Sequence, residues 1–275
     1  MLNLNESARR VLARNNVRVT GQGSNTIIFA HGFGCDQTMW RFVSPAFEDQ
    51  FRVVQFDYVG CGQSDLAAFD PKRYTNLDGY AQDLVEICDA VGLRDGIFVG
   101  HSVSAMIGLV AANRRSELFA KLVMLVPSPR YLNDPPSYVG GFETQDLEGL
   151  LSMMDHNIAG WAEHLAPLLI KSPDRPDLVE ELRERFCTND PAAAKVFARA
   201  AFFADNRSDL IKARVPSLIV QVRDDSLVPL EVGDYLSEHL PHSERIILEA
   251  SGHCPHMSHP QATIEAIRTF VRKPP

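Results

Sequence analysis

The stretch VGHSVSAM at residues 99–106 decides the fold of this chain. It follows the apolar run GIFV at 96–99 and leads into a helical pattern over 105–113. A strand, a tight turn that carries a serine, and a helix together form a nucleophile elbow, which presents the serine hydroxyl at the end of a sheet strand. The start of such a helix directs backbone N–H groups toward charge developing beside that oxygen. Ser102 is therefore the candidate nucleophile.

The elbow departs from the usual G-x-S-x-G pattern because Ser104 stands in place of the second glycine. Glycines are favoured there because the helix and the strand approach each other closely. Serine adds one CH2OH group, so we expect a slightly crowded but workable turn. A plainer interpretation makes Ser102 the N-cap of a serine-rich helix, and the rest of the chain has to discriminate between the two.

The bulk composition limits the classes of function. The 275 residues carry a net charge of −8, which argues against a nucleic-acid partner because phosphate binding needs clustered Lys and Arg. An apolar fraction of 45% suffices for a substantial core. No apolar run reaches the roughly 18 residues of a membrane span, and the N-terminal arm, which we expect to be helical over 6–13, lacks the apolar core of a secretory signal. Five dispersed cysteines fit reduced thiols in a cytoplasmic protein.

Strand and helix patterns alternate along most of the chain, which predicts an α/β fold with a mostly parallel sheet and helices on both faces. Predicted strands lie at 16–20, 26–29, 52–56, 97–99, 122–126, 217–221 and 245–249, and predicted helices at 77–90, 105–113, 232–240 and 261–272.

Between these two parts, residues 133–207 show only helical patterns, over 145–157, 158–170, 177–187 and 190–204. We therefore expect residues 1–132 and 208–275 to form the core, with 133–207 inserted as a four-helix lid. An insertion after a sheet strand lies above the carboxyl edge, where ligands bind in such folds.

A serine hydroxyl needs a base, and the base needs an orienting carboxylate. After Ser102 the chain offers QVRDDSLVP at 221–229 and EASGH at 249–253, each directly after a predicted strand. Both loops therefore lie at the same sheet edge as the elbow. We predict Asp225 as the acid and His253 as the base. Asp224 remains the alternative acid; with Asp225 as the acid, we expect Asp224 to be a solvated turn residue or a further partner behind the triad.

Other histidines compete with His253. His256 and His259 follow it closely, but Pro255 and Pro260 break the helix that would align the three, and no acidic or thiolate cluster completes a metal site. We therefore predict no metal and no cofactor, and we expect His256 and His259 to shape the start of the last helix. His101, beside the nucleophile, is expected to be a packed elbow residue and not a base.

An oxyanion hole needs two donors. The N–H of Val103 at the helix start is one candidate, and the N–H of Phe33 in the loop HGFG at 31–34 is the other. A plain glycine turn is the alternative interpretation of that loop. Cys35 and Cys61 lie near the same edge, but neither has a local base, which disfavours a thiol nucleophile.

The predicted lid is rich in large apolar side chains, most of which we expect to pack it onto the sheet. Trp161 and Phe202 of the lid, together with Tyr131, are the predicted pocket residues. The result would be a closed, mostly apolar pocket for a small neutral substrate.

Several runs of the chain resemble the α/β-hydrolase superfamily and, within it, the RsbQ-like bacterial stress-signalling hydrolases. The chain shares V-S-A-M at 103–106 with the related plant karrikin and strigolactone receptors. The other runs are HGFGCDQ at 31–37, FDYVGCGQSD at 56–65, YTNLDGYAQD at 74–83, PSPRYLNDPP at 127–136, AAFFAD at 200–205 and GHCPHMSHP at 252–260. The resemblance implies a triad of Ser102, Asp225 and His253, a four-helix lid and a hydrophobic pocket.

The resemblance implies two competing functions. One is a serine hydrolase of a small apolar ester or lactone, tied to stress signalling through a PAS-domain phosphatase of the RsbP type. The other is a ligand-sensing protein whose slow hydrolysis acts as a switch for a protein partner. A haloalkane dehalogenase or an epoxide hydrolase would need a carboxylate where Ser102 stands.

Overall fold

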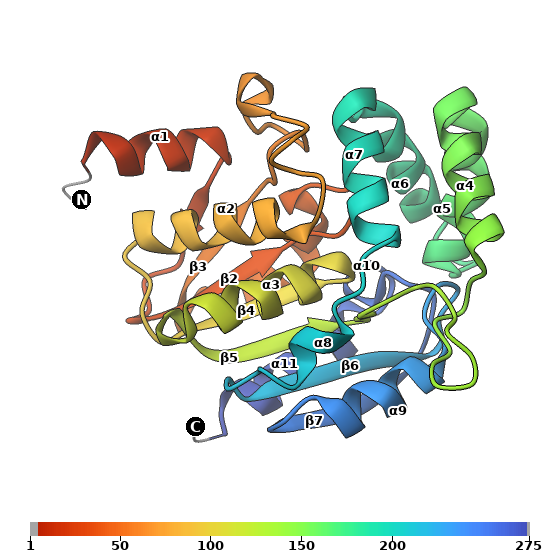
Figure 1. The fold of residues 1–275 in the computed structure, drawn as a ribbon. Helices are drawn as coiled ribbons and strands as arrows, with labels where there is room; N and C mark the ends of the chain where they lie inside the picture. Colours follow the sequence, from red (N-terminus) through yellow and green to blue (C-terminus); the bar gives the residue numbers. More distant parts are fainter. Residues whose placement is uncertain (1–4, 274–275) are drawn as a thin grey trace.

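The computed structural model describes residues 5–273, and within them seven strands form one sheet of order β1-β3-β2-β4-β5-β6-β7 (Figure 1). The edge strand β1 pairs antiparallel with β3, and all the other pairs are parallel. The strands are β1 Arg18–Thr20, β2 Asn25–Ala30, β3 Phe51–Phe56, β4 Gly96–His101, β5 Phe119–Leu125, β6 Ser217–Asp224 and β7 Ser243–Ser251. The central strand β4 is buried along its whole length, as expected for a parallel sheet covered on both sides.

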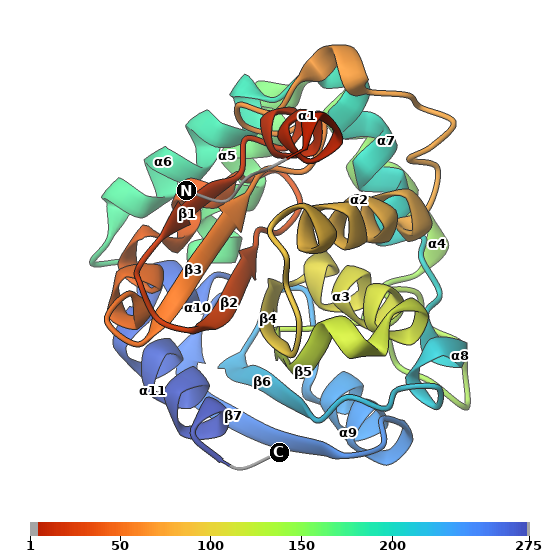
Figure 2. The same ribbon diagram turned by 90° about the vertical axis from the view of Figure 1, so that its left-hand side faces the viewer.

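Helices cover both faces of this sheet, as the alternating pattern predicts. Figure 2 shows α2, α3 and α9 on one side and α11 on the other. These helices and the N-terminal one are α1 Glu6–Arg14, α2 Leu77–Ala90, α3 Val103–Arg114, α9 Leu230–His239 and α11 Pro260–Val271. Shorter helices are η1 Gln37–Phe42, η2 Ser44–Phe47, η3 Leu66–Ala68, η4 Ser116–Leu118, α8 Arg207–Leu210 and α10 Pro255–Ser258. The predicted α/β-hydrolase fold is confirmed.

A helical insert lies between β5 and β6, beyond the carboxyl edge of the sheet (Figure 1). Its four helices, which we call the lid, are α4 Thr144–His156, α5 Ile158–Ile170, α6 Pro176–Thr188 and α7 Pro191–Phe202. Three of these helices begin with residues that favour a helix start. Asn157 caps α5 with its side chain, and Pro176 and Pro191 occupy the first turns of α6 and α7. No helix within residues 5–273 is long and apolar enough to cross a membrane.

The N-terminal arm is fastened to the rest of the core by polar contacts. Arg14 at the end of α1 pairs with Glu86 and with the buried Asp83 on α2. The side chain of the buried Asn15 donates to the backbone oxygen of Asp57, just after β3. The predicted helix of the arm is confirmed, and residues 1–4 of the arm lie outside the described part of the chain.

The elbow places Ser102 at a sharp turn between β4 and α3, with φ 55° and ψ −121°. Its side chain makes no capping hydrogen bond, so the alternative interpretation of Ser102 as a simple N-cap is wrong. A Cβ atom on Gly100 would lie 2.7 Å from the backbone of Ser104, too close for any side chain. The close approach that motivated a glycine in the pattern therefore occurs at Gly100.

We predict that Gly100→Ala destabilises the protein by about 1–3 kcal/mol, because the added methyl group meets backbone that cannot move aside. Gly149→Ala is the matched control, since a Cβ atom at this position of α4 meets nothing within 4 Å. Removing a glycine from a helix interior should stabilise by about 0.5–1 kcal/mol. Urea unfolding of both variants measures the difference, and equal stabilities would contradict the close approach.

Candidate active site

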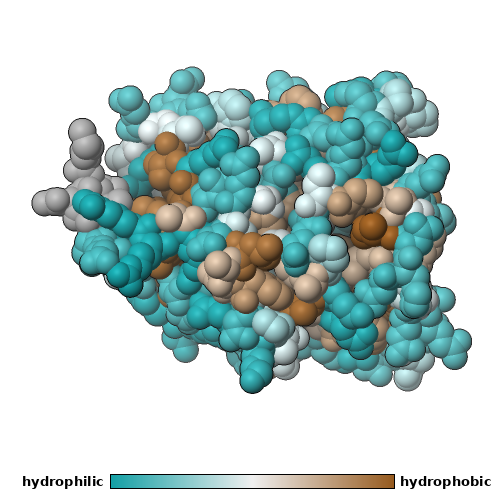
Figure 3. Space-filling view, turned by 90° about the horizontal axis from the view of Figure 1, so that it is seen from above, coloured by the Kyte–Doolittle hydropathy of each residue, from teal (hydrophilic) through white to brown (hydrophobic). Residues whose placement is uncertain are grey.

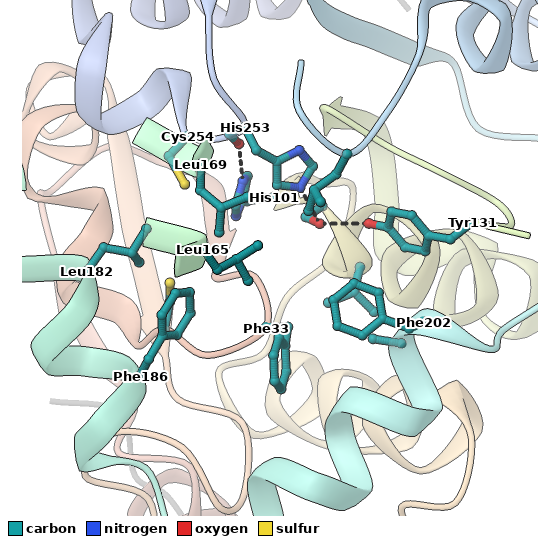
Figure 4. A pocket seen from close by; sticks show the side chains of 15 residues that line it. Phe33, His101, Tyr131, Leu165, Leu169, Leu182, Phe186, Phe202, His253 and Cys254 are labelled. Atoms are coloured by element: carbon teal, nitrogen blue, oxygen red, sulfur yellow. Dashed lines mark hydrogen bonds between the residues drawn. The ribbon is translucent and has the colours of Figure 1, made fainter. Parts of the chain in front are cut away.

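The three side chains predicted as a triad meet at the carboxyl edge of the sheet, and Figure 4 shows where His253 lies. His253 Nε2 lies 2.8 Å from Ser102 Oγ, and its Nδ1 lies 3.0 and 2.9 Å from the two carboxylate oxygens of Asp225. A carboxylate can only accept, so Nδ1 carries the ring proton and Nε2 accepts the proton of the serine hydroxyl. The hydrogen-bond chain from Asp225 through His253 to Ser102 is thus complete.

The backbone fixes Asp225 and separates it from its neighbour. Asp225 Oδ1 accepts hydrogen bonds from the backbone N–H groups of Leu227 and Val228, at 2.8 and 3.2 Å. Asp224 is exposed and forms an ion pair with Lys171, 2.6 Å away. The carboxylate that contacts His253 is therefore that of Asp225, whereas Asp224, the last residue of β6, faces solvent.

The loop that carries His253 rests on the lid helix α5. The backbone N–H groups of His253 and Cys254 both donate to the carbonyl oxygen of Leu169, at 2.7 and 3.2 Å. Gly252 adopts φ +85°, and a Cβ atom there would lie 2.4 Å from the carbonyl oxygen of Ile170. The glycine is therefore needed for the close approach of this loop to α5.

His101 contacts the backbone of the candidate base His253. It is buried, and its Nε2 donates to the backbone oxygen of His253 at 2.8 Å, as the upper dashed line in Figure 4 shows. Burial, reinforced by the nearby His256 and His253, holds the pKa of His101 well below its usual value. His101 is thus a neutral packed residue of the elbow, as the sequence predicts.

His256 and His259 have different surroundings. His256 is fully buried in α10, with its ring 4.7 Å from that of Trp40 and 4.4 Å from that of His101. Neither ring nitrogen of His256 has a hydrogen-bond partner within residues 5–273, and burial lowers its pKa to about 3. His259 lies at the start of α11 as expected, whereas His256 packs beneath the elbow. The described residues contain no group of three or more side chains suited to hold a metal ion.

The two candidate oxyanion donors flank Ser102. The N–H of Val103 opens α3, and Phe33 lies in the loop after β2. Neither N–H donates a hydrogen bond to any other group of residues 5–273. Both are therefore free to bind an anionic oxygen beside the serine.

Ser104, the crowded position of the elbow pattern, connects the elbow to the segments that follow β2 and β3. Its hydroxyl donates to the backbone oxygen of His31, at the end of β2, and lies 2.9 Å from the buried hydroxyl of Tyr58, after β3. Burial raises the pKa of Tyr58 far above its usual range, so the phenol stays protonated and donates. A second glycine in this position could not make these contacts.

A small apolar cavity opens beside Ser102 (Figure 4). Its free volume is about 30 Å³. Of the predicted pocket residues, Tyr131 and Phe202 line it, and the Tyr131 hydroxyl lies 3.1 Å from Ser102 Oγ. Trp161 lies behind this lining, with its ring 6.1 Å from Phe33 and 4.8 Å from Phe186. Further apolar lining residues are Leu165, Leu169, Leu182, Phe186 and Leu227.

Comparison with known proteins agrees with this architecture. A family model described as the alpha/beta hydrolase fold matches residues 25–260. Strigolactone esterase D14 of Arabidopsis thaliana is 39% identical over 263 residues, covering 95% of this chain and 98% of that protein. Karrikin insensitive 2 receptor CA of Petunia hybrida is 37% identical over 257 residues, covering 93% and 95%. The solved structure of olei00960, a hydrolase from Oleispira antarctica, superposes with a TM-score of 0.93 at 45% identity, covering 97% and 98%.

The chain belongs to the α/β-hydrolase family, in the branch of the strigolactone and karrikin receptor relatives. With esterases among these relatives and a direct hydrogen bond between Ser102 and His253, it is a serine hydrolase.

Acid should destabilise the protein partly through His256. Because its folded pKa is depressed, its contribution to stability is fully present above the unfolded value of about 6.5 and falls as pH drops toward 3. Lowering the pH from 7.5 to 5 should reduce the free energy of unfolding of the wild type. We predict that His256→Phe, which lacks the unpaired buried imidazole, loses about 2 kcal/mol less than the wild type over the same change.

Urea unfolding at the two pH values checks this expectation. The control is His164→Gln, because His164 is exposed on α5 and should leave the pH dependence unchanged. The same acid slope in wild type and His256→Phe would show that another group dominates.

Proposed function

We propose that the chain hydrolyses a small apolar ester or lactone through an acyl-enzyme. Ser102 is the nucleophile, His253 the base, and Asp225 the group that orients it and stabilises its charged form. The N–H groups of Phe33 and Val103 form the oxyanion hole. The observation that carries the proposal is the unbroken hydrogen-bond chain from Asp225 to Ser102 at the wall of an apolar cavity.

The geometry supports the following steps. As Ser102 Oγ bonds to the carbonyl carbon, its proton moves to His253 Nε2, 2.8 Å away, and the two N–H groups hold the oxyanion. When the intermediate collapses, the C–O bond of the ester breaks and the proton passes from His253 to the leaving oxygen. Water then attacks the acyl group with His253 again as base, releasing the acid and restoring the serine hydroxyl. In a lactone the leaving alcohol stays attached to the acyl chain.

The substrate class follows from the surroundings of the serine. The cavity is lined mainly by leucine and phenylalanine side chains, with no Arg or Lys among its lining residues in the described chain. Nothing in that lining would neutralise a carboxylate or a phosphate, which favours a neutral substrate. The five cysteines are free thiols, which supports the cytoplasmic location that we propose.

Ser102→Ala should abolish hydrolysis of p-nitrophenyl acetate, because it removes the hydroxyl that forms the proposed acyl-enzyme. Absorbance of released p-nitrophenol measures turnover, and circular dichroism checks that the variant is folded. Turnover by Ser102→Ala at the wild-type rate would remove Ser102 from the mechanism.

The two neighbouring aspartates allow a paired test. Asp225→Asn should lower kcat by about 10³–10⁴, because the amide favours the wrong histidine tautomer. Asp224→Asn should leave kcat within about twofold, since its carboxylate pairs with Lys171 on the surface. A comparable loss in both variants would argue against the assignment of Asp225.

A second candidate function is ligand-dependent signalling with slow hydrolysis. It is favoured by the direct contact between the His253 loop and α5, since a covalent change at His253 that moved this loop would also move α5 of the lid. The relatives named above include a strigolactone esterase and a karrikin receptor. In this version the partner is a PAS-domain phosphatase of the RsbP type, and the role is stress signalling.

Intact mass after incubation with a butenolide separates the two functions. A persistent adduct favours the switch, whereas rapid product release with no adduct favours an ordinary esterase. A pulldown with a PAS-domain phosphatase, with and without the butenolide, tests the partner, and no capture in either condition would count against it.

A further inference from the structure

The cavity beside Ser102 is too small for the substrates proposed above. Its volume of about 30 Å³ is the space that roughly two water molecules occupy, whereas ligand pockets usually measure about 300–1,000 Å³. Any ester or lactone that reaches Ser102 must therefore displace a lining side chain.

A second, larger hollow lies on the outer side of the lid. It is a groove of about 470 Å³ between the end of α4, the start of α5, the end of α6 and the start of α7. Figure 3 looks down on this face and shows apolar side chains over the lid helices, surrounded by a more polar surface. Phe186 of α6 is the one residue within 5–273 that lines both the groove and the catalytic cavity.

We propose that Phe186 is a gate, and that the groove beyond it holds an apolar substituent of a substrate whose ester or lactone group reaches Ser102. The inference rests on the proposed hydrolase function and adds to it the size and shape of the substrate. With the ring of Phe186 displaced, the cavity and the groove become one elongated site that leads from the lid surface to the nucleophile.

Phe186 is a lining side chain that can move without breaking a polar contact of the site. Its ring packs against Trp161 at 4.8 Å and lies over Gly34, where a Cβ atom would stand 2.3 Å from the ring. None of these contacts is polar. By contrast, Leu169 belongs to the turn of α5 that holds the backbone of His253, so displacing it would disturb the base.

Phe33, another aromatic residue of the cavity lining, makes more ring contacts than Phe186. Its ring meets those of Trp161, Phe197 and Phe202 at 5.7–6.1 Å, and its own N–H is the proposed oxyanion donor. Phe33 lines the catalytic cavity but not the groove, whereas Phe186 lines both, so of these two residues Phe186 is the one that can act as a gate.

The groove favours a neutral alkyl or aryl group. Met154, Ile158, Phe186 and Pro191 supply apolar surface. The charged residues at its rim, Asp155 and Lys195, are paired with each other and so offer no free charge to a ligand. His156 is likewise engaged, with its Nδ1 2.7 Å from the backbone oxygen of Ser152.

Two lactones with the same ring test the groove. γ-Butyrolactone is the bare ring, and γ-decalactone adds a hexyl chain; both give a hydroxy acid with one water, followed by titration at constant pH. We expect wild-type kcat/KM to favour γ-decalactone by about tenfold or more, because only its chain reaches the groove.

Filling the groove should remove this preference. Ala194→Trp places a large side chain in the groove and should lower the ratio of the two kcat/KM values by about tenfold. The matched control is Ala159→Trp, an exposed alanine of α5 outside both hollows, which should leave the ratio unchanged. Phe186→Ala should raise kcat/KM for γ-decalactone by opening the route, with thermal unfolding as a check that the lid stays folded.

Cys187 reports on the groove without any catalysis. It lies in the groove and is exposed, whereas the other four cysteines are buried. In Ser102→Ala, which cannot turn the ligand over, saturating γ-decalactone should slow maleimide labelling of Cys187 several-fold, and γ-butyrolactone should not.

The outcomes separate this inference from the proposed function. Equal kcat/KM for both lactones, with no effect of Ala194→Trp on their ratio, overturns the groove while hydrolysis stands. Absence of hydrolysis of both lactones and of p-nitrophenyl acetate overturns the proposed function, and the labelling of Cys187 then decides the groove by itself. Labelling that γ-decalactone does not slow rejects the groove as a binding site.

Discussion

The strained backbone of Ser102 is the constraint on which the site depends. A non-glycine residue at φ 55° and ψ −121° costs about 1–3 kcal/mol, and it persists only when its surroundings hold it. Here the N–H of Ser102 donates to the carbonyl oxygen of Leu125 in the neighbouring strand β5, at 2.8 Å. On the other side, Ser104 ties the start of α3 to the end of β2. The two contacts pin the turn from both sides, so that the hydroxyl faces the lid.

The lid supports the triad as well as covering it. Besides the carbonyl of Leu169 beneath His253, the carbonyl of Leu168 accepts from the hydroxyl of Ser226, at 2.6 Å, in the loop that carries Asp225. The C-terminal end of α5 thus holds the loops of both the acid and the base. Because α6 makes no such contact with these loops among the described residues, Phe186 can move while the triad stays assembled. Helix α5 thus holds the candidate base in place, while α6 carries the side chain proposed to open the route to the serine.

The sequence predicted most elements because their signals are local. The bounds of α2 and α5 are recovered fully, since Asn76 and Asn157 cap them and apolar residues recur at helical spacing. Strand β5 was predicted too short because Lys121 interrupts its apolar run. The structure buries that lysine by letting its ammonium group donate to the carbonyl oxygen of Phe270 at the end of α11, 3.0 Å away. No local pattern could reveal this partner, which is far away in the chain.

The same distinction holds in the site. Asp225 and His253 could be placed because strand ends of a parallel sheet meet at one edge. The contact of Gly252 with α5, the two bonds of Ser104 and the place of Trp161 behind Phe33 depend on how the lid packs, which periodicity does not encode. His256 was assigned to the start of α11 because its neighbours in sequence lie there. Its fully buried place beneath the elbow follows from the packing of α10 against η1.

The histidines around the elbow also explain which of them can take a proton. His101, His253 and His256 lie close together, with ring centroids 5.3 Å apart for the first two and 4.4 Å for His101 and His256. Burial lowers the pKa of both His101 and His256, and neither touches a carboxylate. Of the three histidines, only His253 contacts Asp225, and one buried carboxylate compensates one cation. In the proposed mechanism the proton taken from Ser102 therefore stays on His253, while His101 and His256 remain neutral.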